Sequence, residues 1–303
     1  MSDAYHQYDG KSLTRSQLWM FYNKGPLAFY NKYIAGVREA ESAALIEGQA
    51  FHALTLEGEQ AFHDNFCSDF QTPAAPLGEH PVNYWKRKEP KAELLKLKSQ
   101  WALDNSHKKI LKPESIARIM EMREAAWDQT NTLCFDALHG AETEVEFERF
   151  DNVSGMVLRS RVDILNNNQI TDLKSHSGNF DLDWDRAVEK YGYWFQSAFY
   201  QYTTGVSDLH FLVVEKKRSP QAALFCLDSE TQAFSTTAFV RALARFDSCR
   251  SVYDKCLQVD DLEERDYLIK KAWPGAGTSQ TQLKTTGLSP WFMKREEERY
   301  GQY

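Results

Sequence analysis

The sequence predicts an α/β fold in which helices flank a mixed central sheet, with further helices added at the N-terminal end. Apolar and polar residues alternate in two consecutive strand-length segments, 143–150 and 155–165, and a third strand-length segment follows at 169–175. Two further strand-length segments follow and are separated from these by a helix-length segment, and a second long helical pattern comes after them. The order helix, three strands, helix, two strands, helix is typical of an α/β sandwich around a mixed sheet.

Composition limits the class of protein before any motif is considered. The chain has 303 residues with 42% hydrophobic content, enough to bury a full core, and we expect a single domain spanning residues 1–303. Its five cysteines include no C-x-x-C pair, so we expect reduced, buried side chains and no zinc or iron–sulfur site. With no secretion signal and no run of eighteen apolar residues, we expect a cytoplasmic protein without membrane contact.

A net charge of −7 argues against a protein that coats nucleic acid, because phosphate binding normally accompanies a basic excess. The same charge is compatible with a protein that cuts nucleic acid. A metal-dependent nuclease gathers carboxylates at its centre and requires basic residues only along a groove.

The N-terminal part, residues 1–140, reads as helical. Residues 14–33 predict two short helices broken at Gly25-Pro26, where proline suits a helix start. Residues 41–57 predict an amphipathic helix, and the proline-rich segment 70–90 predicts a loop. Helical patterns resume at 91–104 and 113–138.

The strands begin at Thr143. Residues 143–150 alternate so that Glu144, Glu146 and Glu148 share one face and Val145 and Phe147 lie on the other. In residues 155–165 the apolar set consists of Met156, Leu158, Val162 and Ile164, and the opposite face carries Arg159, Arg161 and Asp163. Three asparagines at 166–168 predict a turn, after which 169–175 returns as the third strand.

The remaining elements complete the sandwich. We expect a long helix at 184–203, strands at 209–216 and 222–228, and a second long helix at 229–257. The core would then comprise residues 141–257 together with the helix at 41–57, followed by a tail at 258–303 in which residues 288–292 dock on the surface.

The hairpin between the second and third strands carries the chemistry. It brings Asp163 and Asp172 side by side, and two carboxylates can hold Mg²⁺ through oxygen ligands. Lys174 shares the face of Asp172, because strand side chains alternate. An Asp-x-Lys motif alone is short and recurs by chance, so its interpretation depends on its neighbours.

Those neighbours produce a resemblance to a known family. The run Asp163 … Asp172-Leu173-Lys174 resembles the PD-(D/E)XK nuclease superfamily, although many members have Glu where this chain has Asp172. Gly48 to His52 is similar to the G-x-x-x-H element of the RecB-like branch, and Gln196 to Tyr200 to its Q-x-x-x-Y element. Segments 13–26 and 159–163 resemble the exonuclease VIII (RecE) group of phage and prophage recombination exonucleases. The likeness covers about residues 12 to 230.

The resemblance implies a restriction-endonuclease-like core and a site that uses Mg²⁺, with Mn²⁺ as a substitute. Asp163, Asp172 and the main-chain carbonyl of Leu173 would hold one ion. His52 and a first-strand glutamate, Glu144 or else Glu146, would help to hold a second. Lys174 would orient the attacking water. Contacts with DNA are expected from Gln196, Tyr200, Arg159 and Arg161.

The function that the resemblance implies is digestion of one strand of linear double-stranded DNA from free ends, in the 5′→3′ direction. The product would be a 3′ overhang for a single-strand annealing protein, and the subunits would form a ring of three or four copies. Two alternatives remain open from the sequence. One is a different RecB-like nuclease, either an endonuclease or an exonuclease of opposite polarity, and the other is a non-catalytic DNA-binding or assembly module on the same fold.

Overall fold

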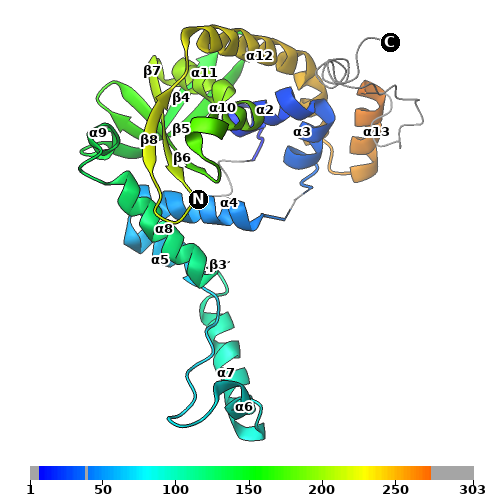
Figure 1. Ribbon diagram of the computed structural model, residues 1–303. Coiled ribbons are helices and arrows are strands. Elements are labelled where there is room, and N and C mark those ends of the chain that lie inside the picture. Colours follow the sequence, from blue (N-terminus) through cyan, green and yellow to red (C-terminus); the bar gives the residue numbers. More distant parts are fainter. Residues whose placement is uncertain (1–6, 38–39, 274–303) are drawn as a thin grey trace, which may run out of the picture.

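The computed structural model describes residues 7–37 and 40–273, and the tail segment 288–292 predicted to dock on the surface lies outside them. These residues form a body, built around a sheet, and an arm that projects away from it (Figure 1). Within the described part of the chain, none of the helices combines the length and the apolar character that crossing a bilayer requires.

The central sheet is mixed, which confirms the predicted fold class. Its strand order is β1-β5-β6-β7-β8, and β4 pairs with the other side of β5. Pairs β4–β5, β5–β6 and β7–β8 are antiparallel, whereas β1–β5 and β6–β7 are parallel. The strands are β1 (Ser12–Thr14), β4 (Glu142–Asp151), β5 (Met156–Asn166), β6 (Gln169–His176), β7 (Asp208–Glu215) and β8 (Ala222–Cys226).

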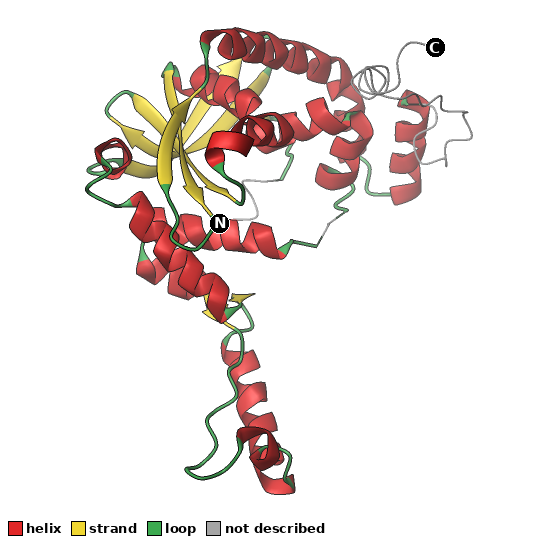
Figure 2. Cartoon of the chain, viewed as in Figure 1, coloured by secondary structure: helices red, strands yellow, loops and turns green. Residues whose placement is uncertain are grey.

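Helices cover both faces of the sheet (Figure 2). One core cluster is rich in aromatic side chains, among them Phe21, Phe29, Phe195, Phe246 and Tyr253, each at most 1% exposed. Burying rings of this size supplies much of the apolar contact that holds the layer together. The helices of this layer are α2 (Arg15–Lys24), α3 (Pro26–Tyr33), α10 (Phe180–Tyr191), α11 (Tyr193–Thr204), α12 (Ser229–Leu257) and α13 (Leu262–Ala272).

A second, smaller core cluster joins the remaining helices of the body to the sheet. Phe51 and Leu54 pack there with Leu173 of β6 and Leu212 of β7. This layer contains α4 (Ala43–His52), the π-helix η1 (Ala53–Glu57), α5 (Glu59–Asn65), α8 (Pro113–Ala126) and α9 (Thr132–Leu138). The candidate site lies where α4 of this layer and α11 of the other approach the same two strands.

Local sequence explains the first helices. Thr14 caps α2, because its side-chain hydroxyl accepts the Gln17 backbone N–H and Gln17 Oε1 in turn accepts the Thr14 backbone N–H at 2.7 Å. Gly25 ends α2 with φ 91°, a conformation that glycine adopts readily, and Pro26 begins α3. The predicted break at Gly25-Pro26 is therefore confirmed.

Several predicted helices are divided in the structure. The segment predicted as one helix at 184–203 is split into α10 and α11 by Gly192, which has a left-handed φ of 67°. The pattern at 113–138 is broken after α8, because the Asn131 side chain caps a new helix, α9. The helix at 41–57 is α-helical only to His52 and continues as the π-helix η1.

Other predictions require correction. The N-terminal part, predicted as helical, also supplies β1 to the central sheet, and the tail begins with the helix α13. Ile164 is buried as predicted but packs in the second cluster, apart from Met156, Leu158 and Val162. This follows because β5 exchanges its neighbour β1 for β6 along its length. All five cysteines are free, as expected, although Cys226 is exposed.

The arm comprises residues 69–108, between β2 (Phe66–Ser68) and β3 (Lys109–Leu111), which pair with each other in parallel. It contains α6 (Pro81–Tyr84) and α7 (Lys88–Asp104). The predicted loop at 70–90 is thus correct for most of its length, but α7 starts at Lys88 and continues to Asp104. None of the residues of α7 is buried.

Candidate active site

Asp163 and Asp172 lie where β5 and β6 separate. Pairing of the two strands runs from Asn166–Gln169 to Ile164–Thr171 and ends there, and the two aspartates occupy the next position on each strand. Beyond this point the Asp163 side chain replaces the backbone as hydrogen-bond partner, because its Oδ2 accepts the backbone N–H of Leu173 at 2.8 Å. The sheet therefore opens at the point where the sequence places its carboxylates.

His52 reaches this opening from the last turn of α4. Its Nε2 lies 2.7 Å from the carbonyl oxygen of Leu173 and 3.6 Å from Oδ2 of Asp163. A carbonyl only accepts hydrogen bonds, so Nε2 carries the proton in this arrangement. Gly48, one turn earlier, lines the same cavity, and a Cβ there would meet only Ser175 Oγ within 4 Å, at 3.9 Å. Gly48 therefore leaves open space in this part of the cavity.

Glu144 completes the group from β4. By the register of β4 and β5 it stands opposite Asp163, and it ion-pairs with Arg161, with 2.8 Å between Oε2 and Nε. Its φ of 56° is unusual for a strand residue with a side chain and costs on the order of 1–3 kcal/mol. Strain of this kind persists where the surroundings fix a residue, and here it accompanies a carboxylate directed at Asp163.

His52, Glu144 and Asp163 fit a divalent metal ion. One ligand atom from each side chain lies within 4.8 Å of the other two. Burial, and after it the nearby Asp163 carboxylate, raise the pKa of Glu144, because both disfavour its negative charge. A cation favours that charge, and an imidazole with two carboxylates is a common donor set for a catalytic metal. Glu146, the other first-strand candidate, is outside this group of described residues.

Asp172 occupies a second, drier part of the site. Its side chain is 1% exposed, ion-pairs with Lys174, and accepts a hydrogen bond at 2.5 Å from Nε2 of Gln196 on α11. Burial raises its pKa to about 6, against the opposing effect of Lys174. Burial acts to lower the pKa of Lys174, but Asp172 and Asp163 outweigh it and the pKa is raised. Lys174 Nζ also lies 4.9 Å from the centre of the Tyr193 ring.

The residues predicted to contact DNA are all engaged within the protein. Gln196 holds Asp172, and the Tyr200 hydroxyl donates to the main-chain carbonyl of Arg161 at 3.1 Å. Arg161 pairs with Glu144, and Arg159 pairs with Glu148 across the strands at 3.1 Å. Gln196, Tyr200 and Arg161 line the cavity described next, so they can still meet a ligand there.

A cavity of about 840 Å³ connects these groups. Its lining includes three basic residues to which the sequence analysis gave no role, Arg15, Arg118 and Lys216. Arg15 donates through Nη2 to the carbonyls of Tyr191 and Gly192, at 3.0 and 2.9 Å, and so fixes the junction of α10 and α11. In the sequence, Arg15 is marked only by its place in segment 13–26, and Lys216 only by the basic run 216–218. No sequence pattern marks Arg118.

The sheet, the helices on both faces and the carboxylates at its opening define the PD-(D/E)XK class of proteins. The family model described as "PDDEXK-like domain of unknown function (DUF3799)" matches residues 16–263. The chain belongs to this family. Membership confirms the superfamily that the motifs suggested, and the three residues that could hold a metal ion agree with it.

A solved structure shares the fold over nearly the whole chain. It is the crystal structure of a protein from Eubacterium rectale named "Putative exonuclease", with a TM-score of 0.54 and 13% sequence identity. The alignment covers 99% of this chain and 98% of that one. No curated protein matches the chain.

Proposed function

We propose that this protein is a metal-dependent deoxyribonuclease that digests one strand of linear double-stranded DNA from its ends. The observation that carries the proposal is the opening between β5 and β6. There a three-ligand cluster, His52, Glu144 and Asp163, lies beside the buried pair of Asp172 and Lys174 in one cavity. Carboxylates around a cation, next to a lysine held in place, are what hydrolysis of a phosphodiester requires.

Some residues of the site would bind a metal ion, and others orient those residues. Asp163, His52 and Glu144 would hold a metal ion, with Asp172 and the carbonyl of Leu173 as further oxygen donors. A bound Mg²⁺, for which Mn²⁺ would substitute, polarises a phosphoryl oxygen and makes hydroxide available near neutral pH. Gln196 fixes the orientation of Asp172 through its amide.

Lys174 is the group that would act on the reacting atoms. The Asp172 carboxylate and the Tyr193 ring hold its ammonium group in place. From there it orients the attacking water and offsets negative charge that develops on the phosphate. Arg161 and Tyr200 lie on the cavity wall, where they would bind the flanking phosphates.

The proposed type of exonuclease and its direction of digestion rest on the sequence resemblance. Segments 13–26 and 159–163 support an exonuclease of the exonuclease VIII (RecE) type, acting 5′→3′ and leaving a 3′ overhang. The name of the Eubacterium rectale protein, "Putative exonuclease", is in line with this proposal. A ring of three or four subunits and a single-strand annealing partner belong to the same proposal.

End-labelled DNA tests the proposal directly. Linear duplex labelled at the 5′ or the 3′ end, and a covalently closed circle, are incubated with Mg²⁺ or with EDTA. We expect Mg²⁺-dependent loss of the 5′ label from the linear duplex as mononucleotides, with the circle intact. Asp163→Ala should abolish the reaction, whereas Glu146→Ala, on the neighbouring strand but outside the cluster, should retain it.

The other outcomes identify the alternatives. Cutting of the circle would show an endonuclease, and early loss of the 3′ label would show the opposite polarity. Binding of DNA without any hydrolysis by the wild type in Mg²⁺ or Mn²⁺ would refute the proposal and indicate a non-catalytic module.

A further inference from the structure

Residues 86–112 form a strongly basic segment in a chain whose net charge is −7. This segment runs from the arm through β3 to the start of α8, and it contains nine lysines and arginines but only three acidic residues. The basic residues are Lys86, Arg87, Lys88, Lys91, Lys96, Lys98, Lys108, Lys109 and Lys112, and the acidic ones are Glu89, Glu93 and Asp104. The rest of the chain is correspondingly more acidic than its net charge suggests.

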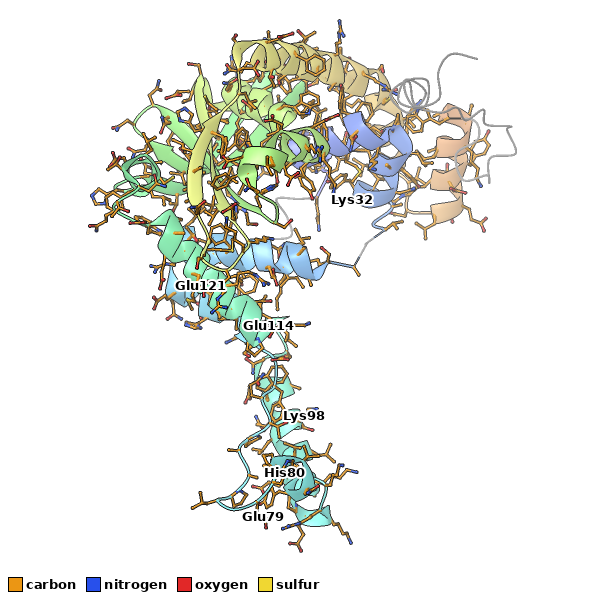
Figure 3. All side chains as sticks on the ribbon, viewed as in Figure 1. Lys32, Glu79, His80, Lys98, Glu114 and Glu121 are labelled. Carbon is orange, nitrogen blue, oxygen red and sulfur yellow. The ribbon has the colours of Figure 1, made fainter. Side chains whose placement is uncertain are left out.

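Most of this charge is presented to solvent. Lys86, Lys88, Lys91, Lys96 and Lys98 are all exposed. Among the residues that the structure describes, none of these five lysines forms an ion pair, whereas Arg87 pairs with Glu79. Figure 3 shows Lys98 on the arm, well away from the body.

One side of α7 is covered and the other is open. Phe70 packs edge-on against Trp101 with ring centres 6.0 Å apart, and Trp85 donates to the carbonyl of Pro73 at 3.0 Å. These contacts attach the loop before α7 to the helix. A shallow hollow on α7 is lined by Leu95, Lys96, Ser99, Gln100 and Leu103. The arm thus has internal support and an unoccupied surface that carries lysines.

The base of the arm is tied to the helix that carries the catalytic histidine. Lys109 of β3 donates to Glu41 at 2.9 Å and to Gln49 of α4 at 2.7 Å. Arg118 of α8 lines the cavity and pairs with Glu47, also on α4, at 2.8 Å. Basic side chains therefore continue from the cavity, past the base of the arm, and along α7.

We propose that the arm binds the phosphate backbone of the duplex outside the active site, on the substrate that the proposed function assigns. A helix of 17 residues is roughly 25 Å long, so α7 can follow about seven base pairs. Exposed, unpaired lysines release counterions when they meet phosphates, which supplies affinity without base recognition. The five exposed lysines between residues 86 and 98 are the groups of the arm that would meet the phosphates.

Fluorescence anisotropy in EDTA measures this contact without hydrolysis. The test variant is Lys91→Gln/Lys96→Gln/Lys98→Gln, and the probe is a labelled 30-base-pair duplex at several salt concentrations. We expect the dissociation constant to rise about tenfold or more at 0.1 M salt, and the slope of its logarithm against log salt to fall by about 3. The control is Lys24→Gln/Lys32→Gln/Lys255→Gln, the same charge change on exposed body lysines, expected to stay within about twofold.

The outcomes separate the arm from the active site. Equal binding by test and control variants would overturn the proposal, as would a wild type that binds no duplex. If the test variant binds duplex more weakly and the control variant does not, the proposal for the arm is supported. This holds even if the wild type cuts no DNA in Mg²⁺, a result that would refute only the proposed nuclease activity. Leu95 and Leu103 on the open face would also suit a second copy of the chain. If Leu95→Ser/Leu103→Ser changes the mass by light scattering while the lysine variant binds normally, the arm is an interface between subunits.

Discussion

Replacing Gln196 with leucine tests whether its amide keeps Asp172 in the ionised form. Nε2 donates to Asp172 Oδ1 at 2.5 Å, and the carboxyl group is 1% exposed. A hydrogen bond to a charged group contributes about 1.5–3 kcal/mol, and one pKa unit corresponds to about 1.4 kcal/mol. Loss of the donor should therefore raise the pKa of Asp172 from about 6 to roughly 7–8.

The readout is the acid limb of the pH profile. The ionised carboxylate is the form that accepts a cation, so we expect activity and Mg²⁺ affinity to require a pH about one to two units higher than in the wild type. Both are measured from pH 5 to 9, by kcat/KM on linear duplex and by titration calorimetry. Gln201→Leu is the control, since this amide on the same helix donates to the Ser207 carbonyl at 2.7 Å. An unmoved acid limb in Gln196→Leu would refute the assigned role.

Three further predictions concern the same site. Lys174→Met should lower kcat about 10²–10³-fold, measured by steady-state kinetics. In EDTA it should also lower the free energy of unfolding by about 3 kcal/mol, measured by urea titration, because Asp172 loses its buried partner. Glu144→Gly should relieve a strained φ of 56°, so the stability of the protein in EDTA should be equal or higher while Mg²⁺ binding is weaker. Glu146→Gly should only lower the stability of the protein. Thermal unfolding with and without Mg²⁺ distinguishes the two variants. In EDTA, the folded protein holds the Asp172 proton up to a pKa of about 6, while the unfolded chain releases it near 3.8. Raising the pH from about 4 to about 6 should therefore destabilise the wild type relative to Asp172→Asn by on the order of 2 kcal/mol. Parallel slopes of unfolding free energy against pH would contradict this.

Sequence patterns predicted those parts of the fold in which neighbours along the chain determine the outcome. Alternation located β4 and β5, and the turn at residues 166–168 located β6 and brought Asp163 opposite Asp172. Helix breaks were harder to predict. Gly192 interrupts a continuous helical pattern only because its left-handed conformation suits the junction that Arg15 ties down.

Features that depend on distant contacts could not be predicted from the sequence. Nothing in the sequence shows that Glu144 adopts a positive φ while Glu146 remains extended, yet this places Glu144 in the metal-ligating cluster. The partner of Gln196 was likewise hidden, because α11 meets β6 only through the tertiary fold. The basic segment around residues 86–98 was visible as charge, but its projection from the body was not.

The position of β4 at the edge of the sheet has a consequence for solubility. Its pairing partner is β5, so the other side of this ten-residue strand exposes a row of backbone groups that another chain can extend. Glu142, Glu146 and Glu148 are exposed along it, and charged side chains disfavour edge-to-edge growth. The glutamates of this strand that do not join the cluster thus have a role of their own, because they keep the open edge of the sheet from seeding aggregation.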